Sequence, residues 1–181
     1  MIIDKEKFKD SFEKAKIRYR ETQSVDINLR FSRGLFFTMC TSIGPSFIFN
    51  EKRKYVISVN LKRKDLFSKL SEEDLIGWFG HELAHIIEYE TMSIFELVLF
   101  AFKYLFNSKY RFSVEKRINA FAYNNGFAQE LFGVWRKLLS LNNLDIKYKE
   151  YITKNYRPEW NDVQQSAESR GISKEFFESF K

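Results

Sequence analysis

The sequence predicts an α+β fold in which one small mixed β-sheet comes early and helices follow. Apart from one N-terminal helix, the alternating pattern of half-buried strands marks the residues before 61, whereas helical spacing prevails after residue 70. The chain has 181 residues, a length that suits one domain. It contains only 7 Gly and 2 Pro, too few for a barrel or sandwich with many tight turns. We therefore expect residues 1–181 to form a single domain.

The first third of the chain predicts one helix and four strands. Apolar side chains recur at steps of three and four over residues 4–20, which indicates an amphipathic helix whose apolar stripe is Phe8, Phe12, Ala15 and Tyr19. Strict alternation over residues 25–31 predicts a strand, and further strands are expected at 36–41, 46–50 and 55–60. The last two flank the charged loop 51–54, so a β-hairpin is the simplest connection.

The rest of the chain predicts helices. Ser71 and Asp74 form a start of the capping-box type, with an acidic first turn that suits the helix dipole. The helix that follows is apolar on almost all sides as far as Ile87, so we expect it to be buried. Further helices are expected at 93–106, 113–131, 135–156 (one or two) and 162–181, with a break at Pro158.

Composition and charge limit the class of protein. A single Cys excludes a disulfide framework and any zinc site built from several cysteines. The first residues carry charges in place of a secretory signal, so we expect a cytoplasmic protein. The net charge of +6 is unevenly spread: residues 1–70 hold 16 Lys/Arg and 8 Asp/Glu and carry +8, whereas residues 71–181 hold 14 and 16 and carry −2. These cations form a solvated rim, or a surface for phosphate or an anionic membrane; without a nucleic-acid-binding motif, we expect no nucleic acid partner.

Both histidines of the chain lie in one motif, His81-Glu82-Leu83-Ala84-His85, which has the form HExxH. On a helix, residues four apart share a face, so both imidazoles can reach one Zn²⁺. Glu82 lies beside them and can act as general base on a zinc-activated water, and later as general acid. We therefore predict zinc ligands at His81 and His85 and a catalytic role for Glu82.

A catalytic zinc site needs a third protein ligand and one open position. Since the chain has no other histidine, that ligand is a carboxylate, or else Cys40 or a tyrosine. Glu88 and Glu90 follow on the same helix, but a second helix that crosses the first can present a carboxylate more easily. Glu115, in the expected helix 113–131, is the best placed.

These residues resemble the gluzincin metallopeptidases, in which a helix of the form E-x-x-x-(D/N)-x-x-A follows HExxH. Glu115, Asn119 and Ala122 fit that pattern. Residues 71–125 are similar to the minigluzincins and to the catalytic core of the HtpX and CAAX prenyl protease class. The resemblance implies a zincin-like fold with Glu115 as third zinc ligand, Asn119 holding the first motif histidine and Ala122 letting the helices approach. The family usually has Asp at the Asn119 position, and a neutral Asn predicts a less basic ligand.

The functional hypothesis is a zinc-dependent peptidase that hydrolyses bonds in a peptide or protein substrate. The alternative is a zincin-fold binding or regulatory protein whose zinc is structural or weakly catalytic. In the resembled family an edge strand binds extended substrate through backbone hydrogen bonds. Residues 55–60 are the candidate here, unless they form an interior strand. Candidates for stabilising an oxyanion are, by residue type alone, Tyr110, Arg111, Tyr123, Tyr148, Tyr151, Tyr156 and Arg157.

The segment between the two metal-bearing helices, residues 94–106, is strongly apolar. It is too short to cross a membrane and contains two charges. A narrow polar stripe at helical spacing leaves a broad apolar face. Three interpretations are open: a core helix over the active site, a surface for self-association or a partner, and a peripheral contact with a membrane.

Overall fold

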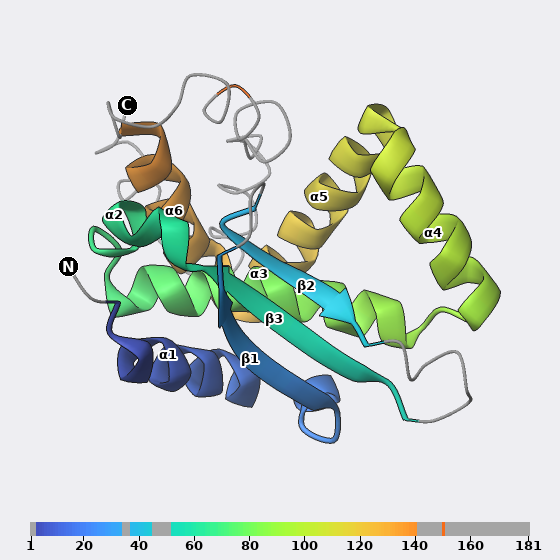
Figure 1. Ribbon diagram of the computed structural model, residues 1–181, viewed down its shortest axis with the longest axis horizontal. Helices are drawn as coiled ribbons and strands as arrows, with labels where there is room; N and C mark the ends of the chain where they lie inside the picture. The colour runs from blue at the N-terminus through green and yellow to red at the C-terminus, as the bar shows by residue number, and fades with distance from the viewer. Residues whose placement is uncertain (1–2, 34–36, 45–51, 141–149, 151–181) are drawn as a thin grey trace.

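The computed structural model describes residues 3–33, 37–44, 52–140 and 150. Within these residues the chain is mostly helical and has one three-stranded mixed sheet near its beginning (Figure 1). The predicted α+β class with a small mixed sheet is therefore confirmed. The expected strand at 46–50, most of the helices expected at 135–156 and the one at 162–181 lie outside the described residues. A single domain over residues 1–181 stays a prediction.

The N-terminal helix α1 (Lys5–Arg18) forms as expected. Asp4 caps it, because its side chain accepts hydrogen bonds from two main-chain N–H groups of the first turn. Phe8 packs edge-on against Phe31 in the sheet and against Phe79 in the central helix, so α1 joins these two parts of the core. The predicted apolar stripe is buried throughout: Phe8, Phe12, Ala15 and Tyr19. A 3₁₀ turn (Arg20–Thr22) then leads to the sheet.

The sheet has the strand order β1-β3-β2. The central strand β3 (Lys54–Asn60) pairs in parallel with β1 (Asp26–Ser32) and antiparallel with β2 (Met39–Ile43). The register places Ile57 between Leu29 and Thr41. Of the two interpretations of residues 55–60, an edge strand or an interior strand, the structure shows the interior strand, because both edges of β3 are already hydrogen-bonded. Within the described residues, β2 lies at the border of the sheet and pairs only with β3.

The helix of the HExxH motif, α3 (Glu72–Glu90), runs behind the sheet (Figure 1) and is buried, as predicted, over residues 74–86. A 3₁₀ turn (Leu61–Arg63) and the short helix α2 (Lys64–Phe67) precede it. Ser71 and Asp74 form the predicted capping box. At the other end, the Arg53 guanidinium donates hydrogen bonds of 2.5 Å to the carbonyls of Tyr89 and Met92. One cation of the basic first half therefore holds the C-terminus of α3.

Helices α4 (Ile94–Phe106) and α5 (Ser108–Ala122) form a hairpin that projects from the C-terminal end of α3 (Figure 1). Only Leu97 and Phe100 of α4 are buried. The interpretation of residues 94–106 as a core helix is therefore right for the stripe of Leu97 and Phe100. It is wrong for the outer face of α4, which includes Phe95, Leu99, Phe102 and Phe106 and is exposed. No helix of the described residues is long and apolar enough to cross a membrane. Self-association and peripheral membrane contact through this segment stay predictions.

The predicted helix over residues 113–131 is in fact two helices with a break between them. The first, α5, begins five residues earlier because the Asn107 side chain accepts a hydrogen bond from the Tyr110 N–H and caps it. A π turn (Tyr123–Phe127) ends it, and Gly126 adopts φ 90°, a left-handed conformation that favours glycine. The second helix, α6 (Ala128–Ser140), packs on α3 at Gly77, where a Cβ would lie 2.6 Å from the Glu130 carbonyl carbon.

Candidate metal centre

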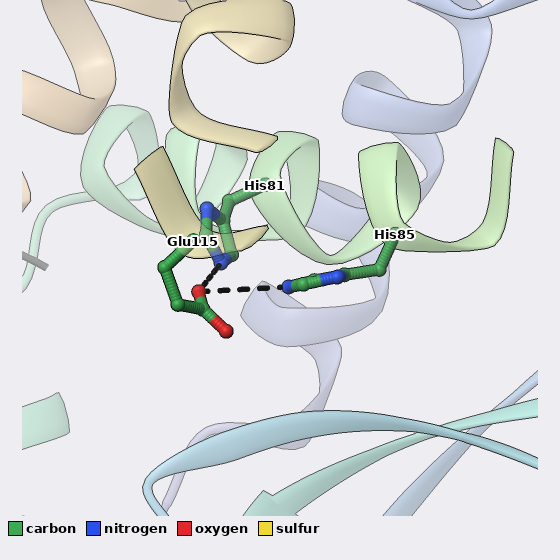
Figure 2. Close-up of side chains that lie close together, drawn as sticks. All are labelled: His81, His85 and Glu115. Carbon is green, nitrogen blue, oxygen red and sulfur yellow. Dashed lines mark ion pairs between the residues drawn. The ribbon is translucent and has the colours of Figure 1, made fainter. Parts of the chain in front are cut away.

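Helix α3 places His81 and His85 one turn apart on the same face (Figure 2). Both side chains are buried, with 2% and 6% of their surface exposed. Their rings meet edge to face, with 4.9 Å between the centroids. Imidazoles in such an apolar helix carry a desolvation cost unless their nitrogens find partners. The partners come from α5.

The third side chain of the cluster is Glu115 of α5, which is 1% exposed and points between the two imidazoles (Figure 2). Its Oε2 atom lies 3.2 Å from Nε2 of His81 and 3.6 Å from Nε2 of His85. Each of the three residues can offer one ligand atom, and these atoms all lie within 4.8 Å of one another. The distances suit donor atoms that share one ion, since zinc–ligand bonds are about 2.0–2.2 Å long.

The other candidate ligands lie elsewhere in the described residues. Glu88 is paired with Arg117 of α5, and Glu90 accepts a hydrogen bond of 2.5 Å from the Tyr55 hydroxyl. Cys40 lies on β2, and burial raises the pKa of its thiol to about 12. A thiol that stays protonated at neutral pH is a poor ligand, since metals bind the thiolate. The structure thus brings together His81, His85 and Glu115, and Glu88, Glu90 and Cys40 are not part of this group.

The charges in the cluster are strongly coupled. Burial alone raises the pKa of the Glu115 carboxyl, but the two imidazoles beside it lower that pKa overall. Burial also lowers the pKa of His85, but the carboxylates of Glu115, Glu82 and Glu88 together more than reverse this effect, with Glu115 the strongest of the three. Glu115 Oε2 is buried without a hydrogen-bond partner among the described residues. A cation between the three side chains would satisfy that oxygen, and two histidines with one glutamate are a donor set that suits catalytic zinc.

Asn119 lies where the gluzincin resemblance places it, against the first motif histidine. Its Oδ1 atom is 2.9 Å from Nδ1 of His81, and both residues are buried. An amide oxygen accepts, so Nδ1 of His81 carries the proton and Nε2 presents its lone pair toward Glu115 and His85. Ala122, one turn further along α5, is completely buried.

Glu82 is held by a residue that sequence reasoning missed. The Thr41 hydroxyl of β2 lies 2.8 Å from Glu82 Oε2 and 3.1 Å from the Glu82 main-chain oxygen, and it donates its one proton to either. The Glu82 side chain is 4% exposed. Thr41 therefore fixes one carboxylate oxygen of Glu82 and links β2 to the metal-bearing helix.

Two tyrosines at the centre were also missed. The Tyr104 hydroxyl of α4 donates to Glu115 Oε1, the oxygen that does not face the histidines. The Tyr89 ring stacks on His85 at 5.9 Å between centroids. Both tyrosines lie in segments whose sequence indicates apolar packing. Because a buried tyrosine hydroxyl usually needs a hydrogen-bond partner, their residue type was the one feature of the sequence that pointed to a polar contact. Of the residues expected to stabilise an oxyanion, Tyr148, Tyr151, Tyr156 and Arg157 lie outside the described residues.

The candidates Tyr110 and Arg111 lie beside these residues on α5. The Tyr110 ring packs edge-on against Phe100, and Arg111 donates to the main-chain oxygen of Tyr104. Tyr123, the remaining described candidate, is buried at the end of α5.

No protein-family model matches this chain, and no curated protein or solved structure is significantly similar to it.

Proposed function

We propose that the protein is a zinc-dependent peptidase of the gluzincin type, with zinc held by His81, His85 and Glu115. One observation carries the proposal: the buried convergence of His81 Nε2, His85 Nε2 and Glu115 Oε2, with Glu82 on the same helix. Two imidazoles and one carboxylate leave one position of a tetrahedral site open for chemistry. Zinc held there supplies Lewis-acid chemistry, because it polarises a carbonyl and makes water acidic near neutral pH.

Glu82 is the proton carrier in this proposal. Thr41 occupies Oε2 of Glu82, which leaves Oε1 free to take a proton from the attacking water. The carboxylic acid so formed then delivers the proton to the nitrogen of the leaving amine. Asn119 keeps the proton of His81 on Nδ1, and Tyr104 keeps one oxygen of Glu115 away from the histidines. Each of these contacts fixes the orientation of a working group before substrate arrives.

Strand β2 takes the substrate-binding role that the sequence suggested for residues 55–60. Its Thr41 contacts Glu82, and within the described residues its outer edge has no partner strand. An extended peptide that added to this edge would lie along the metal centre. Pairing with backbone N–H and C=O groups would hold it regardless of its sequence.

The decisive test replaces Glu82 with Gln. Glu82→Gln should still bind one zinc per chain, because the ligands remain, but should lose peptide hydrolysis by about 10²–10⁴-fold, because the amide cannot take the proton. The matched control is Glu88→Gln, which makes the same chemical change on the same helix at a residue paired with Arg117. Metal content is measured by elemental analysis and turnover with a quenched peptide library. Equal turnover by Glu82→Gln and wild type would sink the mechanism.

One observation favours the alternative of a binding or regulatory protein with structural or weakly catalytic zinc. The acceptor for His81 is the neutral amide of Asn119, and His85 Nδ1 is buried without a hydrogen-bond partner among the described residues. Neither imidazole is thus made more basic by a carboxylate behind it. This alternative predicts stoichiometric zinc in the wild type with no hydrolysis of any peptide in the library.

A further inference from the structure

An apolar groove of about 420 Å³ lies between strand β2 and helix α4. One wall is Thr41 to Ile43 of β2, the floor includes Tyr89 at the end of α3, and the other wall is the α4 side that carries Leu97, Phe100, Ala101 and Tyr104. We call it the β2–α4 groove. Its volume is within the about 300–1,000 Å³ of pockets that bind small ligands. No charged side chain lines it.

The β2–α4 groove adjoins the metal centre at three points. Thr41 contacts Glu82, Tyr104 contacts Glu115, and Tyr89 stacks on His85. Three lining residues therefore touch the proposed base and two of the proposed ligands. Whatever fills the groove is therefore separated from the proposed base and ligands by one layer of side chains, those of Thr41, Tyr89 and Tyr104.

We propose that the β2–α4 groove binds a large uncharged apolar side chain of an extended peptide substrate, next to the bond that is cleaved. This inference rests on the proposed function. An extended chain on the edge of β2 points alternate side chains to one face of the sheet, and residues 41–43 of β2 line the groove together with residues of α4. A charged side chain would lose its hydration there without gaining a partner, so the groove rejects it.

The aromatic lining of the groove favours certain apolar side chains over others. Tyr89 contributes an aromatic ring to the lining of the groove. Its ring also packs edge-on against Phe100, at 5.3 Å between centroids. The aromatic faces suit leucine, methionine or phenylalanine, which gain contact area without requiring hydrogen bonds.

The experiment measures binding apart from hydrolysis. Two fluorescein-labelled nonapeptides of Ala and Ser, identical except for a central Phe or a central Asp, are titrated by anisotropy against zinc-loaded Glu82→Gln protein. The Phe peptide should bind at least about tenfold tighter, the discrimination that an apolar pocket gives. Adding Ala101→Trp should abolish the preference, because the indole fills the groove from an exposed position. The matched control, Leu99→Trp, puts the same side chain on the outer face of α4 and should keep it.

A second variant reverses the effect and does not depend on filling the groove. Ala101→Lys places a cation in the groove and should make the Asp peptide the tighter binder. Equal binding of both peptides by the Glu82→Gln protein, or a preference that survives Ala101→Trp, would overturn the proposal. Cleavage of the same peptides by the wild type tests the peptidase separately. A binding preference without cleavage supports the groove and rejects the peptidase, whereas cleavage without a preference does the reverse.

Discussion

Tyr104→Phe removes one hydroxyl from the protein and should weaken zinc binding by about 10- to 100-fold. The hydroxyl donates to Glu115 Oε1, which leaves Oε2 aimed at the two imidazoles. A hydrogen bond to a charged group contributes about 1.5–3 kcal/mol, and about 1.4 kcal/mol corresponds to a factor of ten. Without the bond, the carboxylate can rotate away from the histidines, so the loss appears as weaker metal binding and not as unfolding.

The assay is a competition titration against a chromophoric zinc chelator, with urea denaturation of the metal-free proteins as a check on folding. Tyr110→Phe is the matched control, since it removes a hydroxyl from the same helical hairpin at a ring that packs on Phe100 and lies under Lys103. Zinc affinity of Tyr104→Phe equal to that of the wild type would refute the reasoning. So would an equal loss in Tyr110→Phe, because the effect would then come from the hairpin and not from Glu115.

Three further predictions concern the base, the packing and the charges. Thr41→Val should lower kcat by about tenfold or less, the value of one hydrogen bond to the base, with unchanged zinc affinity in the same competition titration. Gly80→Ala should lower the free energy of unfolding by about 1–3 kcal/mol in urea titrations, because a Cβ there would lie 2.6 Å from Cγ of the buried Phe127. Burial lowers the pKa of His85, but the carboxylates of Glu115, Glu82 and Glu88 together raise it above its ordinary value of 6.5. The stability from these interactions is therefore complete below pH 6.5 and is lost as pH rises through the folded-state pKa. Metal-free protein should therefore unfold at lower urea at pH 9 than at pH 6, and the opposite order would contradict the assignment of the charges.

The side-chain cluster of His81, His85 and Glu115 could be predicted from the sequence because its geometry is mostly local. His81 and His85 share one helix, and their spacing alone places them on one face. Glu115 and Asn119 required a second helix to cross the first, and the gluzincin resemblance supplied that relation. The structure agrees with the placement: Glu115 lies between the imidazoles and Asn119 behind His81.

The surroundings of the cluster could not be predicted, because they depend on how distant segments pack. Thr41 precedes Glu82 by 41 residues, and only the position of β2 at the border of the sheet brings them together. Residues 55–60 have the composition of a strand, but composition does not tell an edge from an interior. The break at Gly126 interrupts an apolar pattern that continues at helical spacing, so periodicity alone joined two helices. Tyr104 lies in a phenylalanine-rich segment, where its position in the apolar pattern gave no sign of a polar contact with Glu115.

In the proposed function, helix α4 contributes both to substrate recognition and to metal binding. The Tyr89 ring stacks on His85, Phe100 packs on Tyr89, and the Tyr104 ring stacks on Phe100 at 5.7 Å between centroids while its hydroxyl donates to Glu115. This continuous chain of contacts starts at one proposed ligand, passes along the β2–α4 groove and ends at another. A side chain that fills the groove presses on the same rings that orient the ligands. We therefore expect a peptide in the groove to change zinc affinity, and by thermodynamic linkage zinc would then change peptide affinity by the same factor.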